Sequence, residues 1–203
     1  MRKCFETGRW VVALVLALML SGCADKKSSP EPFVASDITG ADFGRDFRLA
    51  DHRGKTRTLA DFRGKAVLLF FGYTNCPDVC LNSLSKLAEV QKSLGEDAAR
   101  VQVIFVSLDP ERDTPERLAN FVTYFNKDFL ALHGDDKAIA GTAREFRATY
   151  GKHDAGSAAG YQIDHSVGIY AFDPRGHLRL LIGYDVEATS IVHDMKLLLG
   201  EKT

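Results

Sequence analysis

The segment Ala66–Phe71 constrains the fold of this chain more than any other segment. It reads AVLLFF, without a polar residue, and follows Gly64-Lys65. A short, continuous apolar run is typical of a strand that is buried on both faces, because helices cover both sides of its sheet. The sequence therefore predicts an α/β domain with this strand at its centre.

Apolar residues elsewhere complete an alternation of strands and helices. Strands are expected over residues 101–108, 129–132, 167–172 and 178–182, and helices after Cys80, from Pro115, over 138–150 and over 191–199. Thr114 is the expected N-cap of the second helix, with Pro115 at its first position. The stretch Gly151–Gly160 is rich in small and polar residues, so we expect a flexible loop there.

Two further segments, Phe47–Ala50 and Thr56–Leu59, flank a polar connection that contains glycine. They predict a β-hairpin ahead of the central strand. The resulting order of elements resembles the thioredoxin arrangement, with the hairpin as an N-terminal extension. We therefore expect a thioredoxin-like α/β fold, in which helices flank a mixed central sheet.

The first 22 residues have the features of a secretory signal. Arg2, Lys3 and Arg9 precede an apolar stretch of ten residues, about half of the roughly 20 that a helix needs to span a bilayer. The sequence LSGC, which ends at Cys23, resembles the lipobox of bacterial lipoproteins, so we expect a lipid on Cys23. The alternative is an uncleaved anchor over residues 10–23.

Residues 1–22 are thus predicted to be a lipoprotein signal peptide, and residues 23–37, which are polar and contain two prolines, a lipid-anchored flexible tether. Residues 38–203 are predicted to form one thioredoxin-like domain at the periplasmic face of a bacterial membrane, with the inner membrane favoured over the outer. The signal carries three positive charges and one negative charge, so its removal changes the net charge from −1 to −3. Because no basic tract remains, nucleic acid is not expected as a partner.

Cys76 and Cys80 are the two cysteines that remain once Cys4 leaves with the signal and Cys23 carries the lipid. A disulfide between them would close a loop of only five residues, so the pair is predicted to serve chemistry rather than structural cross-linking. At a helix N-terminus, free N–H groups favour the thiolate, which is both the nucleophile and the metal ligand. The spacing C-x₃-C brings both sulfurs to one side of a turn, which permits either a disulfide or a soft cation.

Three separated blocks carry a resemblance to a known family. They are FGYTNCPDVC (residues 71–80), SLDPERDTPE (107–116) and DHS (164–166). In this order they resemble the Sco/SenC family of copper-binding proteins, over about residues 38–199. Leu81 stands where the family commonly has proline, and Asn75 where histidine is frequent. We expect these two departures to affect metal affinity or the choice of partner without removing a ligand.

The resemblance implies copper bound by Cys76, Cys80 and a distal histidine, which corresponds to His165. It also implies a role in assembling the dinuclear copper centre of cytochrome c oxidase. The expected partners are then the copper-bearing oxidase subunit, a copper donor and a periplasmic thiol reductant that keeps the cysteines reduced. Two thiolates and an imidazole suit Cu(I) and tolerate Cu(II), although Zn²⁺ accepts the same donors.

Other residues near these motifs are candidates for supporting roles. Asp164 is a candidate to orient His165 as a hydrogen-bond acceptor. Asp78 either tunes the thiolates by its charge or is a solvated acid in the first turn of the helix. Tyr161, with the neighbouring loop, is expected to move His165 towards or away from the sulfurs, and residues 109–116 are interpreted as a turn and a helix cap. The remaining histidines are interpreted as surface or capping residues: His52, His133, His153, His177 and His193.

Two functions remain open at this point. The first is a copper metallochaperone that uses all three ligands to deliver copper. The alternative is a periplasmic thiol–disulfide oxidoreductase, with Cys76 and Cys80 as its redox-active disulfide pair, in which His165 is dispensable. A thiol peroxidase fits poorly, because Tyr73 occupies the position three residues before the nucleophile, where those enzymes have threonine.

Overall fold

The predicted buried strand is the central strand of the sheet. The computed structural model describes residues 32–157 and 160–200. Strand β4 (Ala66–Gly72) lies between β5 (Val101–Ser107), which runs parallel to it, and β9 (Ile169–Phe172), which runs antiparallel. The other strands of this sheet are β1 (Ser36–Asp37), β2 (Leu49–Asp51), β3 (Thr56–Arg57), β6 (Leu130–His133) and β10 (Leu178–Ile182). Their order is β1-β10-β9-β4-β5-β6-β2-β3, which confirms a mixed sheet.

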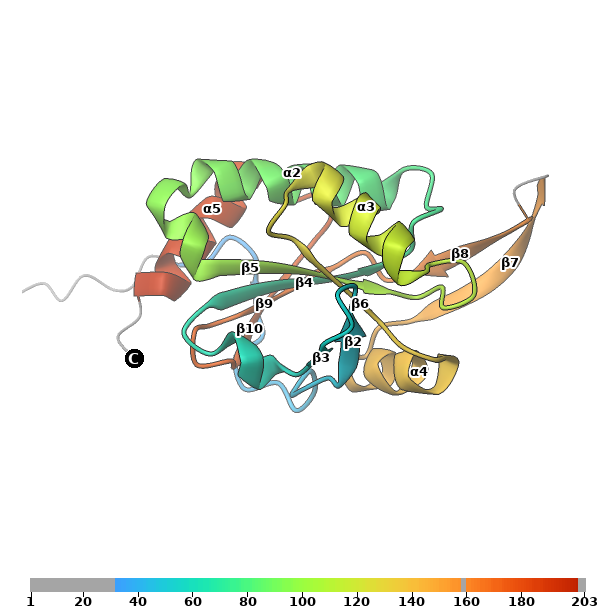
Figure 1. Cartoon of the computed structure of the whole chain (residues 1–203). Helices are drawn as coiled ribbons and strands as arrows, with labels where there is room; N and C mark the ends of the chain where they lie inside the picture. Colours follow the sequence, from blue (N-terminus) through green and yellow to red (C-terminus); the bar gives the residue numbers. More distant parts are fainter. Residues whose placement is uncertain (1–31, 158–159, 201–203) are drawn as a thin grey trace, which may run out of the picture. The chain divides into compact units, whose positions relative to one another are not determined.

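Helices cover both faces of this sheet, as the apolar run in β4 requires. Figure 1 shows α2 (Val79–Ser93), α3 (Pro115–Phe125) and α5 (Ala188–Gly200) on one face and α4 (Asp136–Glu145) on the other. Alternate residues of β4 enter two separate core clusters, so that Phe70 packs under α2 and Phe71 packs towards α4. Two short 3₁₀ helices, over Leu59–Phe62 and Gly95–Arg100, precede β4 and β5. The predicted thioredoxin-like α/β fold is confirmed.

The N-terminal hairpin is also present, although its strands are shorter than predicted. Strand β2 pairs with β3 and, on its other side, antiparallel with β6. Residues ahead of the hairpin also belong to the domain, because β1 pairs with β10 and Ala35 is buried. Asp194 of α5 accepts hydrogen bonds from the backbone N–H groups of Val34 and Ala35. The compact unit therefore begins at Phe33, five residues before the predicted domain boundary.

The expected flexible loop at Gly151–Gly160 is wrong. Strands β7 (Tyr150–Ser157) and β8 (Gly160–His165) form an antiparallel pair, which is a separate two-stranded sheet. The helix predicted over 138–150 is also too long, because α4 ends at Glu145 and Arg147 adopts a positive φ of 52°. Such a φ cannot continue a right-handed helix, and the chain turns there into the hairpin.

The predicted signal peptide, the lipid on Cys23 and most of the predicted tether lie outside the described residues. Among the helices that the structure describes, none combines the length and the hydrophobicity that crossing a bilayer requires.

Candidate metal centre

The two cysteines lie where the central strand passes into the first helix. Strand β4 ends at Gly72, Cys76 lies in the following bend and Cys80 is the second residue of α2. A Cβ at Gly72 would lie 2.7 Å from both Cys80 Sγ and Phe105 Cε2. Glycine is therefore required here so that the buried thiol of Cys80 can approach the strand.

The third donor comes from the end of the hairpin. His165 is the last residue of β8, and its Nε2 lies 3.5 Å from Cys80 Sγ. The donor atoms of Cys76, Cys80 and His165 all lie within 4.8 Å of one another. The imidazole packs edge-on against Tyr73 and Phe70, each with its ring centroid 6.0 Å away. The predicted ligand set is thus assembled from segments 85 residues apart.

The Nε2 nitrogen of His165 faces the sulfurs. Its Nδ1 lies 2.9 Å from the backbone oxygen of Ser166. A carbonyl oxygen only accepts hydrogen bonds, so Nδ1 carries the proton and donates it. In the neutral ring, Nε2 is then unprotonated and available as a ligand next to Cys80.

Cys76 is the thiolate of the pair. Hydrogen bonding with the side chain of Cys80 is the main reason that the pKa of Cys76 falls from its ordinary value of 9.0 to about 4. His165 and the backbone N–H groups of Cys80 and Asp78, at the start of α2, also lower this pKa, and Cys80 N lies 3.4 Å from Cys76 Sγ. Burial opposes the shift but does not cancel it. The expected stabilisation of a thiolate by the helix N-terminus is therefore present, with the sulfur taking the place of a capping side chain.

Cys80 is the thiol of the pair. Its hydrogen bond to the Cys76 sulfur, together with its complete burial, raises the pKa of Cys80. Both cysteines are free, so the structure is that of the reduced pair. The arrangement combines two sulfurs of different pKa and one imidazole, a soft donor set.

Comparison with known proteins agrees with the motifs. Residues 35–200 match the sequence profile of the family described as SCO1/SenC. This chain belongs to the SCO1/SenC family. It is 42% identical over 133 residues to the mitochondrial SCO2 homolog of Bos taurus, which covers 64% of this chain and 50% of that protein. The chain thus spans about half the length of some of the curated relatives that it matches.

Two solved structures of SCO1/SenC proteins are similar to it and are described as having copper bound. The ScoI structure from Bradyrhizobium japonicum has 36% sequence identity and a TM-score of 0.70, and the match covers 77% of this chain and 98% of that one. The ScoI structure from Arabidopsis thaliana has 31% identity and a TM-score of 0.72, with the same coverage.

The two carboxylates proposed to support this SCO1/SenC site do not contact its donors. The side chain of Asp164 is 89% exposed and lies 3.3 Å from His153 Nδ1. It points away from the site because neighbouring residues of a strand, here Asp164 and His165, point to opposite faces. The side chain of Asp78 is hydrogen-bonded to Asn82, and only its backbone N–H faces Cys76. Among the described residues, none of the other histidines joins a cluster of three or more metal-binding side chains.

Both departures from the family pattern are on the surface. Asn75 is exposed and accepts a hydrogen bond from Arg117. Leu81 is 39% exposed and lines a shallow groove of about 350 Å³ with Tyr124 and Phe121. Neither departure removes a ligand, and both side chains are accessible to a partner.

Sequence reasoning missed a network of buried polar residues beside the site. Thr114 does cap α3, as predicted, by accepting from the N–H of Arg117. However, Asp113 and Asp109 in the same block are buried and are hydrogen-bonded to Thr74 and Tyr161 respectively. Two acids at positions i and i+4 beside a buried strand were the available signal, since buried carboxylates require partners.

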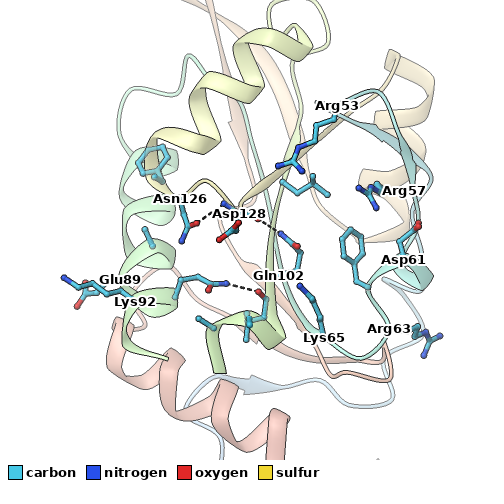
Figure 2. Close-up of a pocket in the computed structure, with 18 residues that line it drawn as sticks. Arg53, Arg57, Asp61, Arg63, Lys65, Glu89, Lys92, Gln102, Asn126 and Asp128 are labelled. Atoms are coloured by element: carbon cyan, nitrogen blue, oxygen red, sulfur yellow. Dashed lines mark hydrogen bonds between the residues drawn. The ribbon is translucent and has the colours of Figure 1, made fainter. Parts of the chain in front are cut away.

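The size of a cavity does not identify this site. A groove of about 1080 Å³ lies at the start of β4 and β5, the end of β4 opposite to the cysteines. Figure 2 shows Lys65, Lys92 and Arg57 around it, with Gln102 donating to the backbone oxygen of Asp128. None of the three donor residues lines this groove. The donor chemistry, rather than the volume, identifies the centre.

Proposed function

We propose that this protein is a copper carrier that binds the metal through Cys76, Cys80 and His165. The observation that carries the proposal is the convergence of two sulfurs and an imidazole nitrogen within 4.8 Å. Thiolate and imidazole donors favour Cu(I), and the net charge of two thiolates and Cu(I) is only −1. The similar ScoI proteins described as having copper bound support the choice of metal.

The carrier would serve the dinuclear copper centre of cytochrome c oxidase, either by delivering copper or by preparing the cysteines that receive it. The resemblance of the three sequence blocks to the Sco/SenC family supports this role. The partners would be the copper-bearing oxidase subunit, a copper donor and a thiol reductant. An oxidising compartment would otherwise convert the pair into a disulfide, which cannot bind the metal.

A lipid on Cys23 would hold the domain at the periplasmic face of a bacterial membrane. This proposal rests on the basic, apolar and LSGC segments of residues 1–23. Residues 1–22 would be removed, and the tether would extend from Cys23 to the compact unit that begins at Phe33. The inner membrane is favoured because the oxidase subunit would be reached from there.

A thiol–disulfide oxidoreductase is the second candidate, and one observation favours it. The pKa of Cys76 is lowered to about 4, which favours its thiolate at neutral pH, and the pKa of the neighbouring Cys80 is raised, which favours its thiol. A nucleophilic thiolate paired with a resolving thiol is the requirement of disulfide exchange. His165 makes no necessary contribution to that reaction.

A copper titration separates the two candidates. The full chain is purified in detergent with Cys4→Ser and Cys23→Ser, so that the pair provides its only thiols. Reduced, anaerobic protein is titrated with Cu(I) against a competing chelator. We expect one copper per chain and a loss of affinity of about 100-fold or more in His165→Ala, since even losing a residue that supports a ligand costs about 10- to 100-fold.

His153→Ala is the matched control, because His153 is an exposed histidine on the same hairpin that pairs with Asp164 outside the site. It should bind copper like the parent protein. Equal affinity in His165→Ala and the parent, with disulfide reductase activity retained, would exclude the three-ligand carrier and favour the oxidoreductase.

A further inference from the structure

Asp113 connects the segment after β5 to the loop that carries Cys76. Its carboxylate is 2% exposed and accepts from the backbone N–H of Thr74 at 3.1 Å and from the Thr74 hydroxyl. It also accepts from the hydroxyl of Ser107 at 2.6 Å. Because Thr74 lies two residues before Cys76, these bonds fix the course of the loop immediately before the thiolate.

The same segment connects to the hairpin that carries His165. Asp109, which is fully buried, accepts from the hydroxyl of Tyr161 at 2.6 Å and from Arg112. Arg112 donates to the backbone oxygen of Tyr161 at 2.8 Å, and its guanidinium lies 3.6 Å from the centre of the Tyr161 ring. Tyr161 precedes His165 by four residues in β8.

These contacts position a hairpin that the main sheet does not hold. Strands β7 and β8 pair with each other and, in the described residues, with no strand of the eight-stranded sheet. Figure 1 shows the pair extending beyond the ends of β4 and β5. Three residues join His165 to β9, and side-chain contacts determine how the rest of the hairpin lies relative to the sulfurs.

We propose that residues 107–113, here called the bridging segment, position the cysteine loop and His165 independently. Asp113 positions the loop that carries Cys76 through its bonds to Thr74. Asp109 positions His165 through its bond to Tyr161. The inference rests on the proposed copper function and names the residues that act on the ligands without touching the metal. The segment is stiff enough for this role, because the N–H of Asp113 bonds to the backbone oxygen of Asp109 at 2.9 Å. One helical turn thus sets the distance between Asp109 and Asp113, which we call the two anchors.

Disrupting the two anchors should have different effects on copper affinity and on the alkylation of Cys76. Tyr161→Phe removes only the hydroxyl and keeps the ring that packs on Arg112. We expect Cu(I) affinity to fall about 10- to 100-fold, as for other residues that orient a metal ligand. The alkylation rate of Cys76 in the metal-free protein should stay within about twofold of the parent, because the hydroxyl does not contact the cysteine loop. Asp109 itself is left intact, since its removal would leave the charge of Arg112 buried and unpaired.

Thr74→Val tests the other anchor, because it removes the hydroxyl that binds Asp113 at nearly constant volume. We expect the pH profile of Cys76 alkylation to shift and copper affinity to fall together. Thr74→Ser restores the hydroxyl and should restore both. Tyr170→Phe is the matched control for Tyr161→Phe, because it also removes a hydroxyl bond, to the backbone oxygen of Phe146 at 2.9 Å, in the opposite core cluster.

The imidazole ¹⁵N chemical shifts of His165 in the metal-free protein provide a readout without copper. They should change in Tyr161→Phe and remain as in the parent in Thr74→Val and Tyr170→Phe. If the parent binds no copper, the proposed function fails, and these shifts and the alkylation profiles still decide the positioning roles. Unchanged shifts and unchanged copper affinity in Tyr161→Phe, or an equal loss of affinity in Tyr170→Phe, would overturn the inference.

Discussion

Replacing Cys80 by alanine tests the origin of the reactive thiolate. The thiol of Cys80 is the largest cause that lowers the pKa of Cys76 to about 4. A hydrogen bond to a charged group contributes about 1.5 to 3 kcal/mol, and one pKa unit corresponds to about 1.4 kcal/mol. We therefore expect the pKa of Cys76 to rise by about 1 to 2 units in Cys80→Ala. The backbone N–H at position 80 remains in the variant and keeps part of the shift.

The assay is the rate of alkylation of Cys76 by iodoacetamide as a function of pH, in metal-free protein that lacks Cys4 and Cys23. With a shift of about 1.5 units, the thiolate fraction at pH 5 falls about fourfold. Cys80→Ser is the control, because its hydroxyl still donates to the sulfur and should keep the pKa nearer to that of the parent. A pKa in Cys80→Ala within about 0.3 units of the parent would refute the assignment of the thiol as the main donor.

Three further outcomes follow from the packing and the charges. Because folding lowers the pKa of Cys76, its thiolate contributes stability that is complete above pH 9.0 and is lost as the pH falls through about 4. The urea midpoint of the parent should therefore drop more between pH 7 and pH 4 than the midpoint of Cys76→Ala. Leu84→Ala, at a fully buried position of α2, should lower the free energy of unfolding by about 2 to 5 kcal/mol in urea titrations. Gly72→Ala should cost about 1 to 3 kcal/mol and also weaken Cu(I) binding, because the added methyl group displaces the thiol of Cys80.

The sequence predicted those parts of the fold in which periodicity reflects burial. The apolar run Ala66–Phe71 and the helical spacing of apolar residues after Cys80 both indicate burial in a core. The predicted strand and helix are present as β4 and α2. The hairpin of β7 and β8 was missed for the converse reason. Most of β7 is exposed, so no apolar alternation marks it, and the alternation in β8 is limited to Tyr161 and Ile163. Residues Gly151–Ser157 of β7 therefore have the composition of a loop although they form a strand.

The metal centre was predictable in two different ways. The relation of Cys76 to Cys80 is local, and the strand, the bend and the helix that create it are all visible in the sequence. His165 was assigned from the resemblance to a family, because no local rule brings residue 165 to residue 80. The bonds from Asp113 to Thr74 span 39 positions and belong to neither case. Side-chain networks of this kind depend on tertiary packing, so the sequence alone predicts only a turn and a helix cap for residues 109–116.

The carrier and the oxidoreductase use the same first step, because Cys76 is the thiolate in both. In disulfide exchange its sulfur attacks a target disulfide and releases one target thiolate; Cys80 then loses its proton, attacks the Cys76 sulfur and releases the second. In copper binding Cys80 also loses its proton, but its electron pair goes to the metal. Since Cys80 stays protonated beside the thiolate, each pathway requires an event that removes this proton. The two functions therefore differ in what the deprotonated sulfur of Cys80 binds: the Cys76 sulfur in disulfide exchange, or copper in the carrier. The nitrogen of His165, 3.5 Å from the Cys80 sulfur, favours a metal.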